Sequence, residues 1–533
     1  MGSRRSGRVK SRIRGNAMDQ FRPQLLLSFA AIAVSVFFTV GPAAANDAAS
    51  PPAPGPWDQQ SSWNMGLVGY NDLQGRSTYQ PLVIHQGDRE IAYMAHHAGT
   101  GLNPLNGQTE NNGTSIVDVT DPKNPKYLFH IPGPAGSIDA GGSQMVRVCS
   151  GNVLPSATRQ EAKRKQGHWY MLRTHGNSSG LTTPIESQEI YDVTDPSNPQ
   201  FLKTIVGGLS NTHKNWWECD TGIAYLVANI PSEGWKHSGS TQHLKIYNLH
   251  DPSNPVYIRD FGLVGQQPGA TTFEGPVNPP SGIHGPISGY PIRDRVYMPY
   301  GVGSNGVVQI VDRRKLLYGN PSDVLSPQIS YWTLVPDSPG DQGGHTAFPI
   351  YKKHQDLLLV TSEEGVNECK DSTGADSPDH IAWLYDITNE KKPTQLSTLT
   401  VPRNPGDFCD KGGRFGAHAS SESFYRPYYG KLAIISWFNA GVRAWDIRDP
   451  SDPMPVAYFI PAPNENTIAN CLVVNGNNVD CKNAIQTNNV ELDDRGLIYI
   501  ADRAGTGMHI LQLTGKAKEV VRENDDQEHE QHR

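Results

Sequence analysis

Several motifs that mark common protein classes are missing from this chain of 533 residues. None of its six cysteines belongs to a C-x-x-C pair, which excludes zinc-ribbon and thioredoxin-like sites. No G-x-S-x-G nucleophile elbow, in which the serine stands between a strand and a helix, is evident, and this disfavours a serine hydrolase. Hydrophobic residues make up only 37% of the chain, and no apolar run reaches the roughly 20 residues that a transmembrane helix needs.

Glycine and proline are more frequent than usual. There are 53 glycines and 41 prolines, about 18% of the chain against roughly 12% in average usage. This is below the roughly 25% or more that marks collagen-like or low-complexity chains. It is too much for a helical bundle, because glycine and proline are the poorest residues in a helix interior. The composition therefore favours a large, turn-rich β protein.

The first 45 residues are typical of a secretory signal. Seven basic residues precede an apolar run over residues 25–40, and a small-residue A-x-A site follows at Ala43-Ala44-Ala45. The alternative is an uncleaved membrane anchor, for which 16 apolar residues are short. Met18 is a second candidate for the start of translation. We expect cleavage after Ala45 and a periplasmic or secreted protein without a stable membrane span.

Removal of this signal would leave a strongly acidic chain. The 45 residues hold seven basic residues and one acidic residue, so 39 basic and 52 acidic residues remain, a net charge of −13. Binding of nucleic acid depends on neutralising phosphates with lysine and arginine. Nucleic acid is therefore not an expected partner.

The six cysteines form an even set in a chain that we expect to be exported. Such a set predicts disulfides, with fifteen possible connectivities. Free catalytic thiols are the weaker alternative. We predict that sequence neighbours pair, which gives Cys149–Cys219, Cys369–Cys409 and Cys471–Cys481.

An internal repeat runs through the chain. Four copies are clear, at residues 114–125 (TSIVDVTDPKNP), 188–199 (QEIYDVTDPSNP), 244–255 (LKIYNLHDPSNP) and 442–453 (VRAWDIRDPSDP). Looser copies bring the total to seven, at residues 307–316, 382–393 and 508–517. A run rich in β-forming residues precedes each copy, and another follows most copies.

The repeat unit predicts the fold class. Alternating Val, Ile and Tyr form strands, and the D-P-x-N-P element forms a turn because proline fixes φ and aspartate bonds the nearby backbone. Such units cannot bury both faces alone and must stack on their neighbours. Radial stacking of seven units predicts an all-β, seven-bladed β-propeller of four-stranded antiparallel blades. Two packed β-sandwiches are the alternative, but they do not explain one continuous repeat.

The repeat also predicts the domain boundaries. We expect one propeller domain over residues 64–515, in which the stretch at 66–73 (GLVGYNDL) supplies a strand that completes the last blade. A flexible segment over residues 46–63 precedes it. The highly charged end, residues 516–533, is expected to be disordered because it has almost no apolar content.

The repeat segments SIVDVTDP, EIYDVTDP and VRAWDIRDP resemble the LVIVD-repeat family of exported bacterial β-propeller proteins. The stretches at residues 212–226, 414–424 and 486–513 are also similar to that family, so the resemblance extends over roughly residues 66–515. It implies a β-propeller in the cell envelope or periplasm. It implies no settled reaction, so the function has to be argued from a site.

A histidine recurs at one equivalent place in blades three to six, shortly before the second strand. The successive separations are 71, 61 and 73 residues, for His213, His284, His345 and His418. Residues at one phase of a propeller lie on one ring, so these side chains can converge on the axis. Neutral imidazole suits copper and iron, and propellers such as the carotenoid cleavage oxygenases and nitrous oxide reductase hold iron or copper with histidines. We predict a metal site made by these four histidines together with His96, His97 and His175.

Two other interpretations of the histidines stay open. Each can hydrogen-bond within its own blade and fix a turn, or the set can form a metal-free ligand site. Calcium, bound by the aspartate-rich repeat turns, is a weaker candidate cofactor.

The leading functional hypothesis is a metal-dependent oxidoreductase that uses copper or iron on a small molecule at one mouth of the axial channel. His97, Glu364 and Glu491 are the candidates for proton transfer. The alternative is a non-enzymatic cell-envelope scaffold that binds an envelope protein or a small ligand.

Overall fold

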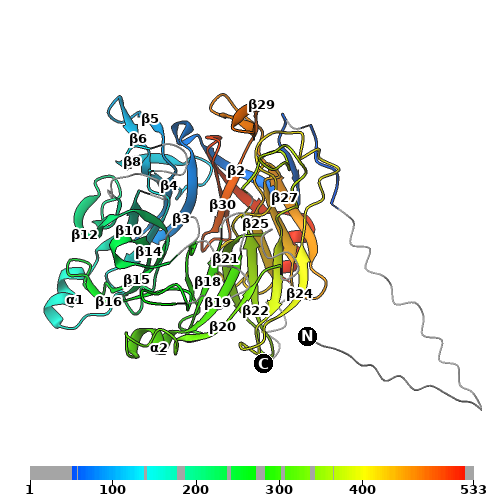
Figure 1. Cartoon of the computed structure of the whole chain (residues 1–533). Helices are drawn as coiled ribbons and strands as arrows, with labels where there is room; N and C mark the ends of the chain where they lie inside the picture. The colour runs from blue at the N-terminus through cyan, green and yellow to red at the C-terminus, as the bar shows by residue number, and fades with distance from the viewer. Residues whose placement is uncertain are drawn as a thin grey trace, which may run out of the picture. The chain divides into compact units, whose positions relative to one another are not determined.

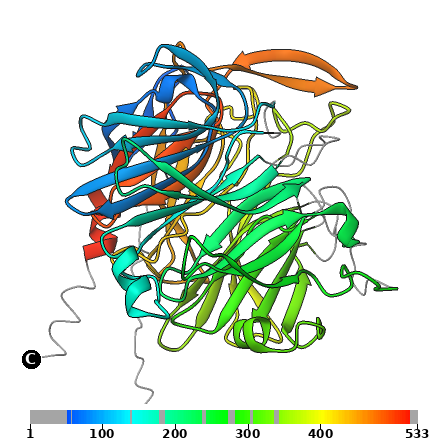
Figure 2. The same ribbon diagram turned by 90° about the vertical axis from the view of Figure 1, so that its left-hand side faces the viewer.

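The structure is a computed structural model that describes residues 51–56, 58–136, 141–176, 186–236, 242–271, 282–301, 306–335, 342–363 and 365–522. Seven four-stranded antiparallel sheets are arranged around a common axis (Figures 1 and 2). The predicted seven-bladed β-propeller is confirmed.

The first four blades follow one another along the chain. Blade 1 contains β3 (Thr78–Gln86), β4 (Arg89–His96), β7 (Gly113–Asp118) and β8 (Lys126–Pro132). Blade 2 contains β9 (Val146–Ser150), β10 (Trp169–His175), β11 (Glu186–Asp192) and β12 (Gln200–Leu209). Blade 3 contains β13 (Asn211–Trp217), β14 (Ile223–Asn229), β15 (His243–Asn248) and β16 (Val256–Phe261). Blade 4 contains β17 (Ile287–Ser288), β18 (Arg295–Tyr300), β19 (Val307–Asp312) and β20 (Gln328–Thr333).

The last three blades complete the ring. Blade 5 contains β21 (Gly344–Tyr351), β22 (Asp356–Ser362), β23 (Ala382–Asp386) and β24 (Thr394–Leu399). Blade 6 contains β25 (Leu432–Ser436), β26 (Val442–Asp446), β27 (Met454–Ile460) and β1 (Ser61–Trp63). Blade 7 contains β30 (Thr487–Leu492), β31 (Ile498–Asp502), β32 (Met508–Leu513) and β2 (Met65–Asn71). Two hairpins stand outside the blades, β5 (Thr100–Asn103) with β6 (Gln108–Asn111), and β28 (Ala469–Val474) with β29 (Asn477–Asn483).

The N-terminal segment closes the ring through two blades. β2 pairs with β32, which is the strand that residues 66–73 were predicted to supply. β1 pairs with β27 in blade 6, so residues 61–63 are ordered in a sheet and the predicted flexible segment over 46–63 is corrected there. The inner edge of blade 6 is formed by the segment around Ser420, which bridges to Ile435 on β25.

Neighbouring blades are held together by apolar side chains that alternate along the repeat strand. On β7, Ile116 is buried against Val146 and Val148 of blade 2, whereas the next residue, Val117, is buried against Ile510 of blade 7. Successive side chains of a strand point to opposite faces. The I-V pair of the repeat therefore fills two interfaces at once, which is why each blade needs two neighbours.

The aspartates of the D-P turns act as turn residues. The Asp121 carboxylate accepts hydrogen bonds from the Lys123 backbone N–H at 3.0 Å and from the Asn124 side chain at 2.7 Å. Asp195 accepts the Ser197 backbone N–H in the same way, at 3.0 Å. These carboxylates are therefore used within their own turns, as the repeat sequence predicts.

Helices are short and lie at the edges of the propeller. They are α1 (Arg159–Lys165), α2 (Arg313–Tyr318), α3 (Gly515–Arg522) and two 3-10 turns, η1 (Leu73–Gly75) and η2 (Pro231–Glu233). In the part of the chain that the structure describes, no helix combines the length and apolar character needed to cross a bilayer.

Helix α3 corrects the start of the predicted disordered tail. Residues 516–522 are helical, and Ala517, Val520 and Val521 pack into the apolar cluster beneath blades 6 and 7. The Lys431 ammonium donates a hydrogen bond to the Val521 carbonyl at 3.0 Å. The few apolar residues of the charged end are spaced on one helical face, which the overall composition of the segment concealed. Residues 523–533 lie outside the described part.

All three predicted disulfides are present. Cys149 and Cys219 join blade 2 to the end of β13 in blade 3, and Cys369 and Cys409 join the loops that follow β22 and β24. Cys471 and Cys481 lie within the β28–β29 hairpin, which projects from the top of the molecule in Figure 2. Such bonds form in oxidising compartments.

Loss of the hairpin disulfide is expected to leave global stability almost unchanged. The side chains of β28 and β29 are exposed or half-buried, so the hairpin contributes nothing to the apolar clusters between blades. A Cys471→Ser/Cys481→Ser variant should therefore change the free energy of unfolding by no more than about 0.5 kcal/mol. Urea denaturation of the oxidised proteins measures this, and a loss above about 2 kcal/mol would show that the hairpin belongs to the cooperative core.

Candidate metal centre

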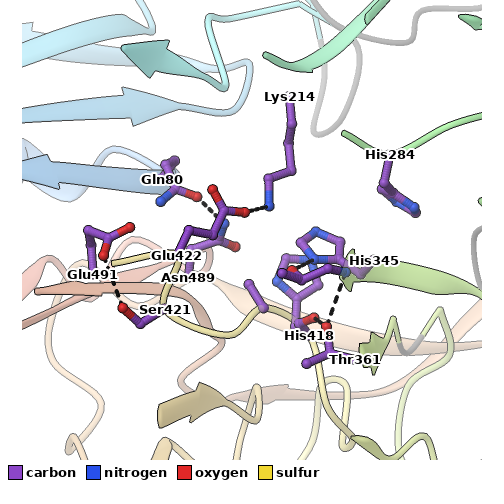
Figure 3. Close-up of polar contacts among 12 residues, drawn as sticks. Gln80, Lys214, His284, His345, Thr361, His418, Ser421, Glu422, Asn489 and Glu491 are labelled. Atoms are coloured by element: carbon purple, nitrogen blue, oxygen red, sulfur yellow. Dashed lines mark hydrogen bonds and ion pairs between the residues drawn. The ribbon is translucent and has the colours of Figure 1, made fainter. Parts of the chain in front are cut away.

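Four histidines of successive blades form an arc at the axis. The ring centroids are 5.1 Å apart for His213 and His284, 4.8 Å for His284 and His345, and 4.1 Å for His345 and His418. All four side chains are buried, with at most 9% of any residue exposed. Each lies at or just before the innermost strand of its blade, because the repeat returns the chain to the axis at the same phase. Figure 3 shows three of them, His284, His345 and His418, lying together.

Tyr79 on β3 completes the arc from blade 1. Its hydroxyl is 2.8 Å from Nε2 of His345, and its ring lies 5.4 Å from that of His213 and 5.8 Å from that of His418. The His97 ring also packs against Tyr79, with 5.3 Å between the two ring centroids. Tyr79 was not among the predicted site residues, which were histidines and carboxylates. Its signal was the shared pattern at the start of the inner strands, Thr78-Tyr79 in blade 1 and Thr212-His213 in blade 3.

Glu363, the residue after β22, is the acidic member of the cluster. Its Oε2 is 2.7 Å from Nε2 of His284, and its Oε1 is 3.7 Å from Nε2 of His418 and 3.6 Å from Arg414. Burial raises the pKa of Glu363, but hydrogen bonds and charge interactions with His284 and His418 outweigh it and hold the pKa well below its usual value. An ionised carboxylate therefore faces the histidines. The predicted Glu364 lies outside the described residues.

The hydrogen bonds of two histidines fix which ring nitrogen faces the cluster. Nδ1 of His284 donates to the Gly344 carbonyl at 2.7 Å, and Nδ1 of His418 donates to the Asn488 carbonyl at 2.7 Å. In the neutral ring, Nε2 then carries the lone pair. The contact of Nε2 of His284 with Glu363 therefore needs either a second proton on the ring, which makes the hydrogen bond that lowers the pKa of Glu363, or a cation shared by the two groups in place of that proton.

The ligand atoms of His284, His345 and Glu363 lie within 4.8 Å of one another. Burial, together with the nearby His418 and Lys214, keeps the pKa of His345 well below its usual value, so its ring is neutral at pH 7.

Metal-ligating histidines usually donate from their other ring nitrogen to a carbonyl or carboxylate, as His284 does to Gly344. His345 instead contacts the Tyr79 hydroxyl through Nε2 at 2.8 Å and the Thr346 hydroxyl through Nδ1 at 3.0 Å. The cluster can therefore present nitrogen and oxygen ligands from two adjacent blades to one ion.

Two predicted ligands lie elsewhere. His96, the last residue of β4, points into blade 1, where its ring nitrogens bond Thr78 at 3.0 Å and Ser115 at 2.7 Å. His175, at the end of β10, lies 3.5 Å from Glu189 and is partly exposed. Side chains of consecutive strand residues point to opposite sides, so only His97 of the His96-His97 pair reaches the axis.

A second buried cluster, which is ionic, lies beside the histidines. Lys214, next to His213, and Arg147 on β9 both form ion pairs with the buried Glu422. Arg147 also stacks over the Trp216 ring, 4.5 Å from its centroid. Figure 3 shows the Lys214–Glu422 pair and, beyond it, Glu491. No sequence signal marked Glu422, because its partners are 208 and 275 residues away.

Glu491, a predicted proton-transfer residue, is buried in this ionic cluster and not among the histidines. It accepts hydrogen bonds from Ser421 and from the Leu492 backbone N–H, both at 3.0 Å. Burial and then the charge of Glu422 raise its pKa to about 7. The structure therefore holds a carboxyl group that is protonated well above the pH at which a free glutamate ionises.

Glu491 is expected to make stability depend on pH. Between about pH 4.5 and 7 the folded state binds more protons at this residue than the unfolded state, so the free energy of unfolding falls as pH rises. The difference between a pKa of about 7 in the folded state and 4.5 in the free group corresponds to about 3 kcal/mol. Urea denaturation of the wild type and of Glu491→Gln at pH 5 and pH 8 tests this. The free energy of unfolding of Glu491→Gln, relative to that of the wild type, should be about 3 kcal/mol higher at pH 8 than at pH 5. Parallel pH profiles would contradict the assignment.

A cavity of 850 Å³ opens near the histidine cluster. Its wall includes Ala98 of blade 1, residues of the β28–β29 hairpin, and two arginines, Arg414 and Arg503. Arg414 also contacts Glu363, so it links the cavity to the cluster. A small molecule in this mouth would meet positively charged side chains before it reached the histidines.

Two other groups of metal-ligating side chains occur among the described residues. One, on blade 3, joins Glu233, His243 and Asp260. The ammonium of Lys245 already bonds both of its carboxylates, at 2.6 Å and 3.0 Å. The other joins His85, Glu90 and Asp494, with two of its three members exposed. The axial cluster is the one that is buried throughout.

Comparison with known proteins gives no family. No protein-family model matches the chain, and no curated protein matches it. A hypothetical selenium-binding protein from Sulfolobus tokodaii is similar in structure, with a TM-score of 0.45 and 13% identity over 81% of this chain and 84% of that chain. Sqt1 from Chaetomium thermophilum has a TM-score of 0.41 and 8% identity over 84% of this chain and 99% of that chain. These likenesses are too low to bear on function, and the resemblance to LVIVD-repeat proteins stays a prediction.

Proposed function

We propose that the axial cluster binds one copper or iron ion and that the protein is an exported oxidoreductase acting on a small molecule. The observation that carries this proposal is the approach of Nε2 of His284 to Glu363, 2.7 Å from a buried carboxylate while Nδ1 is committed to a carbonyl. A cation shared between the two acceptors satisfies both. His345, with its ring kept neutral, supplies a further nitrogen ligand.

The ligand set fits these metals. Imidazole nitrogen suits copper and iron, while a single carboxylate adds negative charge without the all-oxygen environment that calcium prefers. A bound ion of this kind would supply electron exchange or polarise the substrate. His213 and His418 lie close enough in the arc to complete the coordination from the neighbouring blades.

The chain's own residues have separate roles in this proposal. In this proposal the Tyr79 hydroxyl accepts the hydrogen of Nε2 of His345, so that Nδ1, 3.0 Å from the Thr346 hydroxyl, is the nitrogen left for the ion. Arg414 holds Glu363 in place and lines the mouth cavity, so it can orient a small molecule that enters there. Burial of the cluster excludes bulk water. The disulfides and the predicted signal agree with a periplasmic or secreted protein.

Elemental analysis tests the proposal. The protein is produced with its signal, purified from the periplasm, and then dialysed against copper(II) or iron(II) followed by metal-free buffer. About one ion per chain is expected to remain. Folded protein that retains less than a tenth of an ion under every condition would contradict the proposal and would favour the alternative, a non-enzymatic scaffold in which an imidazolium–carboxylate pair holds the axis together.

A further inference from the structure

A second cavity lies between blades 5 and 6, on the outer side of the propeller. It has a volume of 380 Å³ and shares no residue with the mouth cavity. Its walls are apolar, with Trp445 of β26 and Tyr458 of β27 on one side and Phe408 from the loop after β24 on another. Trp63 of β1 and a proline-rich stretch at residues 51–54 close it. One charged side chain, Arg443, forms part of this wall.

Arg443 occupies a position of the repeat at which the polar side chains of blades 2, 3 and 4 have side-chain partners. The residue three before the repeat aspartate or asparagine is Glu189 in blade 2, Lys245 in blade 3 and Gln309 in blade 4. Glu189 pairs with Arg173 at 3.1 Å, Lys245 with Glu233 at 2.6 Å, and Gln309 with the Tyr300 hydroxyl at 2.8 Å. The fold therefore tolerates a buried polar group here when a side-chain partner accompanies it.

The guanidinium of Arg443 has no such partner. Only 8% of the residue is exposed. Nε donates to the Ala440 carbonyl at 2.9 Å, but Nη2 is buried without a hydrogen-bond partner among the described residues. The guanidinium lies over the rings of Tyr458 and Phe408, at 4.7 Å and 5.4 Å from their centroids. Aromatic faces attract a cation but do not accept its hydrogen bonds in the way that a carboxylate does.

A second buried cation lies next to Arg443. Lys411 is also 8% exposed, and its ammonium lies 4.6 Å from the centroid of the Phe408 ring. Burial, followed by the charge of Arg443, lowers its pKa to about 8. Burial also lowers the pKa of Arg443, to about 10. Lys411 does not line the cavity and also feels the charge of Asp407, whereas Arg443 lines it and pairs with no carboxylate among the described residues. Buried charges are normally paired, so Arg443 indicates that an anion belongs in the cavity.

We propose that this pocket binds a small organic carboxylate with a flat apolar body. The carboxylate would accept hydrogen bonds from the Arg443 guanidinium, and the body would stack between Trp445, Tyr458 and the proline-rich stretch. The volume lies at the lower end of the range for small-molecule sites. Because the walls are aromatic and proline-rich, a bare inorganic anion would leave most of the cavity unfilled, so the apolar body is part of the expected ligand.

Binding of benzoate and phenylacetate to the full mature chain tests the proposal. Isothermal titration and the thermal midpoint are measured for both acids, with benzamide as an uncharged match for benzoate. The acids are expected to bind the wild type and raise its midpoint, and benzamide is not. Failure of both acids to bind at 10 mM, or equal binding of benzamide, would overturn the proposal.

Substitutions then locate the site. Arg443→Met should weaken binding at least tenfold, which corresponds to about 1.4 kcal/mol. The exposed Arg426→Met is the matched control and should bind as the wild type does. Arg443→Lys keeps the charge but loses the planar fork, so intermediate binding is expected. Folded Arg443→Met that binds benzoate within threefold of the wild type would show that Arg443 only stacks on its aromatic neighbours.

Discussion

Alanine in place of His345 is expected to abolish stoichiometric binding of copper or iron. His345 lies at the centre of the arc, with ring neighbours at 4.8 Å and 4.1 Å, and its neutral ring offers nitrogen to an ion held by His284 and Glu363. Losing one of three close ligands leaves a site that is open to water and poorly charged for a transition metal. Metal content should fall from about one ion per chain to less than a tenth.

The control for this variant is another buried histidine. His130 on β8 bonds Ser115 and the Asn111 carbonyl within blade 1, at 3.1 Å and 2.9 Å, and takes no part in the arc. His130→Ala should retain the metal of the wild type. His345→Gln, which keeps more of the side-chain volume, guards against a folding defect. Equal metal content in His345→Ala and wild type would place the ion elsewhere.

Alanine at Glu422 is expected to be the most destabilising single substitution in the ionic cluster. Glu422 is buried and pairs with both Lys214 and Arg147. Burial raises its pKa, but the charges of Lys214 and Arg147 hold it below its usual value. Without the carboxylate, two cations would remain buried without their partner. Breaking such a pair costs about 3–5 kcal/mol.

Urea denaturation at pH 7 measures this loss. Glu465→Ala, which removes an exposed carboxylate, is the matched control and should change the free energy of unfolding by no more than about 0.5 kcal/mol. Glu422→Gln separates charge from volume, because it fills the same space without neutralising Lys214. A loss of less than about 1 kcal/mol in Glu422→Ala would mean that Lys214 and Arg147 are satisfied by other groups.

The fold could be predicted from the sequence because each copy of the repeat contains the residues that form its strands and its turn. The I-V and I-Y pairs place one side chain in each of the two interfaces between neighbouring blades. The aspartate of each D-P turn accepts hydrogen bonds from the nearby backbone. Every copy of the repeat therefore predicts the same kind of blade. The ends of the domain were harder to predict. Strand β1 is only three residues long, and the apolar face of α3 rests on Ala517, Val520 and Val521 within a highly charged segment.

The site could be predicted only in part. The blade period marked four of the histidines that the structure brings together, but it could not say which of His96 and His97 faces the axis, since that depends on the last residue pair of β4. Tyr79 is not a residue type that predicts a metal site, and it shares with the histidines only its position at the start of the inner strand. Lys214 and Glu422 meet across the ring from positions 208 residues apart, and contacts of that length leave no local pattern in a single sequence.

Anomalous X-ray diffraction at the copper and iron absorption edges would test the central claim most directly. Crystals of the mature protein, loaded with either metal and washed in metal-free buffer, are measured on both sides of the edge. We expect one strong anomalous peak between the ring nitrogens of His284 and His345 and the carboxylate of Glu363. Crystals with no peak at this position, or with peaks only at exposed groups such as His85, would contradict a metal centre on the propeller axis.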